Sequence, residues 1–159
     1  LGGVLGWDWL ANISWFGTPS MATVTIIVVS IWQNIGFLMI IYTAGLQTIP
    51  KDVMESAELD GCSGLKKVLK IELPLLMPTV TINLFVSISG AFKSFDIPNA
   101  MTGGGPYGST MPVAMNIYQE AFTKYNLGYG SAKSVILFLT VAAVTLIQLY
   151  CTRKKEVEY

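Results

Sequence analysis

Three long stretches without a charged side chain constrain the fold of this chain more than any other feature. They cover residues 21–46, 73–92 and 134–152. The first gives a helix of about 39 Å, and a hydrocarbon core of about 30 Å needs about 20 residues to cross. Only 13% of the 159 residues are charged, so a soluble domain would lack the polar surface to cover all three. The sequence predicts an all-α integral membrane protein, with polytopic transmembrane helices at about 21–46, 73–97 and 131–152.

The distribution of Lys and Arg predicts how these spans are oriented. Cations gather in the connection 47–72 and in the C-terminal tail, whereas residues 1–20 have none and 98–130 has only Lys124. By the positive-inside rule, the 47–72 loop and the C-terminus are expected in the cytoplasm. The chain begins at Leu1 without a signal peptide and enters its first span from outside, so residues 1–159 are interpreted as the C-terminal part of a longer transmembrane domain.

Composition excludes several function classes. The formal net charge is zero, which argues against a nucleic-acid partner. His is absent and the three uncharged runs contain no Asp or Glu, so a membrane-embedded enzyme or a metal site is not indicated. The glycines at 103–105 and Pro106 predict a tight loop, but the Lys-Ser/Thr of a phosphate-binding loop is missing. No cofactor is expected to bind this chain.

The cytoplasmic connection is predicted to form two short helices. The first should begin near Pro50 and end at Asp60–Gly61, because Pro suits a first helical turn and Gly the position after a helix. The second should run from Ser63 to about Glu72, with Lys66, Lys67 and Lys70 in water, and Leu73–Pro74 should end it or bend it into the membrane. Such a projection suits the groove of a partner protein.

Two outward segments are predicted to lie at the membrane boundary. Residues 1–20 contain aromatic side chains suited to the headgroup region, and Pro112–Lys124 is predicted to form a short amphipathic helix along the outer interface. The aromatic residues are Trp7, Trp9, Trp15 and Phe16.

Within the cytoplasmic connection, the run from Glu55 to Pro74 closely resembles the EAA motif of binding-protein-dependent ABC importer permeases. Glu55, Ala57, Asp60 and Gly61 stand at the motif's spacing, followed by the I-x-L-P pattern. Ser56 replaces the first Ala, but it is also small. The segments Phe95–Asp96 and Thr102–Pro106 resemble the maltose-type sugar permeases in particular. The corresponding ATPase-coupling residues are Glu55, Ser56, Ala57, Asp60, Gly61, Ile71, Leu73 and Pro74.

This resemblance implies a partial ABC importer permease fold in a bacterial or archaeal inner membrane. The implied partners are a cytoplasmic ABC ATPase dimer, a second permease subunit and an extracytoplasmic solute-binding protein, with ATP hydrolysis in the partner chain. The implied function is ATP-driven solute import, with sugars as the solutes expected for this branch. Permeases for phosphorylated polyols or oligosaccharides, and a non-transport structural membrane subunit, remain the alternatives.

Polar residues within the spans are candidates for the solute path. Polar groups are costly in the membrane unless they face a partner or a water-filled cavity. Asn83 and Ser87 are four residues apart on one helix face, and Gly90 follows nearby. Their amide and hydroxyl groups suit the hydroxyls of a neutral sugar, while hydrogen bonds between helices are the alternative.

Overall fold

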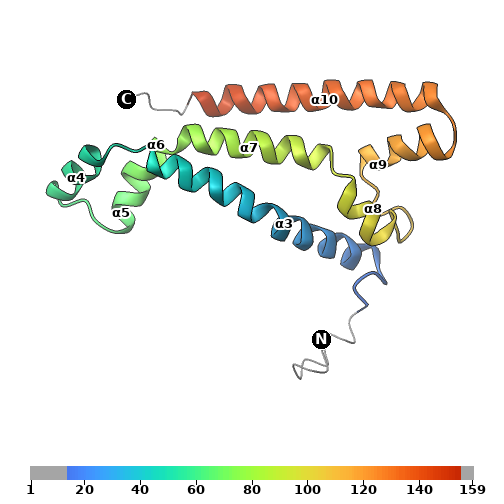
Figure 1. The fold of residues 1–159 in the computed structure, drawn as a ribbon, viewed down its shortest axis with the longest axis horizontal. Coiled ribbons are helices and arrows are strands. Elements are labelled where there is room, and N and C mark those ends of the chain that lie inside the picture. Colours follow the sequence, from blue (N-terminus) through green and yellow to red (C-terminus); the bar gives the residue numbers. More distant parts are fainter. Residues whose placement is uncertain (1–13, 155–159) are drawn as a thin grey trace. The chain divides into compact units, whose positions relative to one another are not determined.

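The computed structural model describes residues 14–154, and all regular structure within this range is helical (Figure 1). This confirms the predicted all-α class. The helices, in chain order, are α3 (Pro19–Gln47), α4 (Lys51–Leu59), α5 (Leu65–Lys67), the π-helical η1 (Val68–Glu72), α6 (Leu73–Leu75), α7 (Met77–Phe92), α8 (Asp96–Thr102), α9 (Val113–Tyr118), the π-helical η2 (Gln119–Thr123) and α10 (Leu127–Arg153).

Two helices in the described range are long and apolar enough to cross a membrane by themselves. They are α3, with 29 residues, and α10, with 27, which correspond to about 44 and 41 Å of helix. Threonine hydroxyls inside both helices donate to carbonyls one turn earlier, as Thr25 does to Met21 and Thr140 to Ile136, each at 2.8 Å. These bonds satisfy the hydroxyls without a neighbouring helix.

The middle apolar run, expected as a span at about 73–97, is divided between helices. Residues 73–75 end the helix that starts at Leu65, and α7 follows after a bend of 68° at Leu76. The bent pair counts as a third span only if both parts are taken together. At the other end, α7 stops at Phe92, and α8 starts only at Asp96.

Two prolines, Pro74 and Pro78, explain where this helix widens into a π turn and where it bends. The ring of Pro74 conflicts with the carbonyl four residues earlier in an ordinary α-helix, and the wider π turn of η1 lies directly before it. In η1, the Leu73 N–H donates to the Val68 carbonyl. Pro78 lies in the first turn of α7, where a missing N–H costs nothing. The bend was predicted at Leu73–Pro74, but the structure has it at Leu76.

The first helix of the 47–72 connection begins near Pro50, as predicted, whereas the second begins two residues later than predicted. Pro50 is the N-cap of α4, with an extended ψ of 134°, and Lys51 is the first helical residue. The second helix begins at Leu65 rather than Ser63 because Gly64 takes φ +58° and ψ −139°, outside the helical region.

The described chain forms two compact units, each with its own contacts. One contains residues up to Gln33 together with 94–132, and the other contains 34–93 together with the residues from Lys133 onward. In the second unit, α7 packs closely on the later half of α3, where a Cβ at Gly45 would lie 2.8 Å from Thr79 Cγ2. The Gln148 amide of α10 donates to the Thr81 carbonyl of α7 at 3.3 Å.

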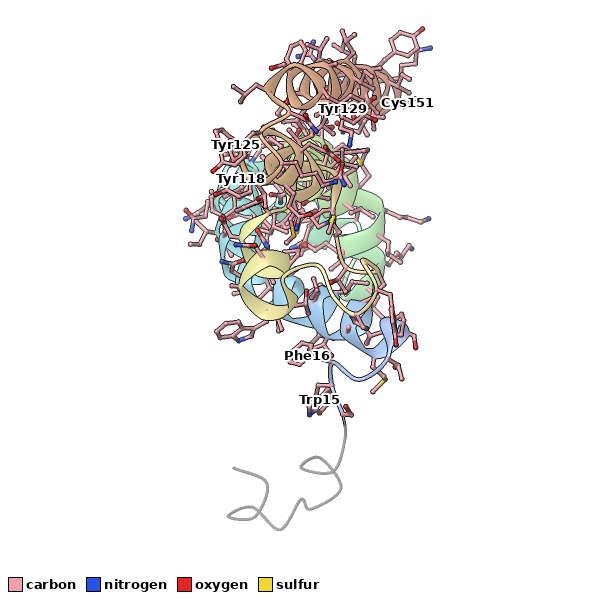
Figure 2. All side chains as sticks on the ribbon, turned by 90° about the vertical axis from the view of Figure 1, so that its right-hand side faces the viewer. Trp15, Phe16, Tyr118, Tyr125, Tyr129 and Cys151 are labelled. Atoms are coloured by element: carbon pink, nitrogen blue, oxygen red, sulfur yellow. The ribbon has the colours of Figure 1, made fainter. Side chains whose placement is uncertain are left out.

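In the first unit, the predicted helix over Pro112–Lys124 is present as α9 and η2, with Pro112 as N-cap. Met115 and Ala121 are buried, whereas Tyr118 and Phe122 are exposed. Trp15 and Phe16 lie together just before α3 and are also exposed (Figure 2). Trp7 and Trp9 lie outside the described residues.

Candidate coupling loop and transport path

The turn at Gly61 has the geometry that the motif pattern predicts. Gly61 has φ +75°, a left-handed conformation that glycine adopts without a Cβ penalty. The Cys62 N–H donates to the Ala57 carbonyl at 2.9 Å, and the Gly61 N–H donates to the Glu58 carbonyl at 3.0 Å. This pair of bonds is a Schellman motif, which satisfies the last carbonyls of α4. Asp60 is the exposed C-cap.

The predicted coupling residues divide into exposed and covered positions. On α4, Glu55 and Ser56 are exposed, whereas Ala57 is buried. In the second helix, Ile71 and Pro74 are half-buried and Leu73 is exposed. A partner can therefore reach the acidic group of the motif, while its alanine contributes to the internal packing of the loop.

Large apolar side chains of this loop project into the open. Leu59 at the end of α4 is 88% exposed, and Leu65 at the start of α5 is 79% exposed; Leu69, one turn later, is exposed as well. Several exposed large apolar side chains in one short loop are a feature of interaction surfaces. The predicted coupling residues did not include Leu59 and Leu65, although both lie beside the glycine turn in the sequence.

Lys67 contradicts the prediction that all three lysines of the second helix lie in water. Its side chain is only 15% exposed, and its Nζ contacts Glu58 Oε1 at 2.6 Å. Lys66 and Lys70 are exposed as expected. The hydrogen bond and charge of Lys67 lower the pKa of the Glu58 carboxyl below its usual value. An ion pair thus joins α4 to α5.

The residues predicted for the solute path differ in accessibility. Asn83 is 3% exposed, and its Nδ2 donates to the Leu38 carbonyl of α3 at 3.5 Å. This is the geometry of the helix-to-helix alternative. Ser87 and Gly90, farther along α7, are exposed, and no atom lies within 4 Å of a Cβ built at Gly90.

The glycine-rich segment forms the tight loop that its composition predicts. α8 ends at Thr102, and its C-cap Gly103 has φ +60°. The hydroxyls of Thr102 and Thr110 lie 2.7 Å apart across the loop, and Thr110 also donates to the Gly105 carbonyl at 2.6 Å. Beyond this closure, Tyr107 is 98% exposed. Within residues 14–154, no cluster of three or more His, Cys, Asp or Glu could hold a metal ion.

Comparisons with known proteins agree with the motif. Residues 4–157 match the family described as binding-protein-dependent transport system inner membrane component. A probable starch degradation products permease, AmyD of Thermoanaerobacterium thermosulfurigenes, is 37% identical over 94% of this chain and 51% of its own length. The sulfoquinovosyl glycerol permease SmoG of Agrobacterium fabrum is 40% identical over 91% and 47%. The sn-glycerol-3-phosphate permease UgpA of Brucella abortus is 36% identical over 95% and 50%.

The chain thus spans about half the length of these relatives. The family is the membrane component of its transport systems, distinct from the ATPase. The match covers nearly every residue, including the described helices and the loop with the Gly61 turn. This protein belongs to the family of binding-protein-dependent transport system inner membrane components.

Proposed function

We propose that this chain is part of a permease subunit of an ATP-driven importer and that the loop from Lys51 to Glu72 receives the force of ATP hydrolysis. The observation that carries this proposal is the exposure of Glu55, Leu59 and Leu65 within this loop. Apolar groups flanking an accessible carboxylate suit a protein groove that offers both an apolar pocket and a cation.

The proposed mechanism is a lever movement. An ATPase dimer that closes on ATP would displace α4, and the loop would transmit that displacement through the bend at Leu76 to α7. Glu55 would form a charge-assisted contact with the ATPase, and the Gly61 turn would aim it. The cation-rich composition of this connection and of the C-terminal tail supports a cytoplasmic location for both. The other proposed partners are a second permease subunit and an extracytoplasmic solute-binding protein.

The proposed solute class is sugars. Relatives named for starch degradation products and sulfoquinovosyl glycerol support this assignment, and the relative named for sn-glycerol-3-phosphate supports phosphorylated polyols as the second candidate. Exposed Ser87 and open Gly90 are the proposed path residues, with Asn83 beside them. Competition of labelled-sugar uptake by neutral sugars, but not by glycerol phosphate, would favour the first class.

The coupling assignment is tested in the full-length permease, reconstituted in vesicles with its ATPase, companion permease and binding protein. Glu55→Lys and Gly61→Asp should insert and assemble normally but hydrolyse ATP with little solute import. No atom lies within 4 Å of a Cβ at Gly61, so Gly61→Asp causes no steric clash. It acts instead through the conformational cost of a left-handed backbone, about 1 kcal/mol, and through an added negative charge beside a helix C-terminus.

Gly108→Asp is the matched control, because Gly108 also has φ +75° and open space around its Cα. It lies in the glycine-rich loop, outside the proposed coupling surface, and should leave the ratio of import to hydrolysis unchanged. Normal import by Glu55→Lys and Gly61→Asp would refute the coupling role. A purified protein that binds no ATPase would instead support the structural-subunit alternative.

A further inference from the structure

The ion pair between Glu58 and Lys67 connects the two helices of the coupling loop. The two residues are nine positions apart, on α4 and α5, and their charged atoms lie 2.6 Å from each other. Neither residue is among the predicted ATPase-coupling residues, so a contact with the ATPase does not account for this ion pair.

The two partners are buried to very different extents. The Lys67 side chain is 15% exposed, whereas that of Glu58 is 63% exposed. A lysine packs its aliphatic stem on protein and keeps its ammonium group near water or an anion. Because Lys67 is largely covered, Glu58 is the group that neutralises its charge. The two partners therefore differ in their roles: Lys67 is held in place by the surrounding loop, and Glu58 supplies the negative charge that it needs.

Glu58 is unfavourable for α4 when the helix is considered alone. It lies in the last turn, where the helix dipole is negative, and no basic residue of α4 occupies that turn. The cation that compensates this charge comes from the next helix. The ion pair therefore offsets the unfavourable charge of Glu58 at the C-terminus of α4 only while α5 keeps Lys67 in place.

The segment between the two helices depends on glycine conformations. Gly61 and Gly64 have φ +75° and +58°, and neither has an atom within 4 Å of a built Cβ. Side-chain packing around the glycines therefore does little to restrain this turn. The restraint comes from the Schellman bonds on one side and from the ion pair across it.

We propose that Glu58 and Lys67 are positioning residues, which lock α4 onto α5 so that a displacement of Glu55 is passed to the membrane helices without loss. This inference rests on the proposed coupling function and adds the pair that makes the loop rigid. Without the pair, α4 would pivot about the glycine turn when the ATPase moves it.

The test compares Glu58→Lys, Lys67→Glu and the double exchange in the full reconstituted transporter. Two quantities are measured: solute imported per ATP hydrolysed, and the distance distribution between spin labels at Asp52→Cys and Lys70→Cys in a background without other cysteines. Each single variant should broaden the distribution and lower the import ratio by about threefold, the scale of a partly exposed ion pair. The double exchange should restore both quantities. Lys66→Glu is the matched control, since Lys66 is the exposed neighbour of Lys67, and it should resemble the unmodified protein.

Three results would overturn the inference. They are single variants with unchanged distance distributions, a double exchange as impaired as the single ones, and distributions that broaden and recover while the import ratio stays constant. The variants Glu55→Lys and Gly61→Asp show whether only the inference about the ion pair fails or the proposed coupling function fails as well. If those variants uncouple transport and the Glu58 and Lys67 variants do not, only the inference fails.

Discussion

At the scale of single residues, the ion pair between Glu58 and Lys67 should make the proposed rigidity of the coupling loop dependent on pH. The hydrogen bond and charge of Lys67 lower the pKa of the Glu58 carboxyl below the usual 4.5. A carboxyl whose pKa is lowered by folding adds stability that is fully present above its unfolded pKa and is lost as the pH falls through the folded pKa. The pair should therefore hold at neutral pH and weaken only below about pH 4.5.

Spin-label distances across the loop check this pH dependence. The distribution should broaden on acidification in the unmodified loop, with a midpoint below the usual Glu value. Lys67→Met, which retains an apolar stem without the charge, should be broad already at neutral pH and change little on acidification. A pH response of equal size in Lys67→Met would show that another group is responsible.

Asn83 and Ser87 should respond differently to the same truncation. Asn83 is buried and bonds to the Leu38 carbonyl, so Asn83→Ala should lower transporter stability by about 0.6–2 kcal/mol, the range for polar contacts between membrane helices. Ser87 is exposed, so Ser87→Ala should leave stability unchanged and weaken the apparent affinity for solute. Thermal denaturation in detergent and uptake kinetics separate the two effects. An unchanged apparent affinity in Ser87→Ala would remove Ser87 from the path.

At the scale of helices, Gly45 determines how closely α3 approaches α7. A Cβ at this position would lie 2.8 Å from Thr79 Cγ2, whereas no atom lies within 4 Å of a Cβ at Gly36 on the same helix. Small residues allow membrane helices to pack at short range. Gly45→Leu should therefore lower the denaturation temperature and yield of the folded transporter, while Gly36→Leu should alter neither. Equal loss in both variants would show that any large residue on α3 is harmful.

Helix ends were predictable from sequence where one residue determines the backbone. Gly61 ends α4 as expected because the left-handed turn after a helix favours glycine. The break at Leu76 was not located, since Leu73–Pro74 and Pro78 are equally plausible places for a bend until the π turn of η1 is known. The burial of Lys67 was missed for a similar reason. It depends on the angle between two helices across a glycine turn, which residue spacing does not contain.

At the scale of the whole molecule, two kinds of surface require different neighbours. The long helices α3 and α10 leave large apolar residues exposed, such as Trp32 and Phe138, as suits contact with lipid or other membrane helices. The loop between α3 and α7 also exposes leucines, but it carries lysines and acidic residues beside them. A mixed surface of this kind suits a protein partner in water, which agrees with the role proposed for this loop.

The proposed topology makes a final prediction for the whole chain, since the coupling loop and the glycine-rich loop should lie on opposite sides of the membrane. Cys62 is a native half-buried thiol beside the Gly61 turn, and Tyr107→Cys would place a thiol in the glycine-rich loop at a position where the native side chain is 98% exposed. In variants that retain only one of these thiols, a membrane-impermeant maleimide should label Cys62 only in inside-out vesicles, and the thiol introduced by Tyr107→Cys only in intact cells. Labelling of Cys62 from outside intact cells would place the loop where no cytoplasmic ATPase can reach it, and the coupling mechanism would then be wrong.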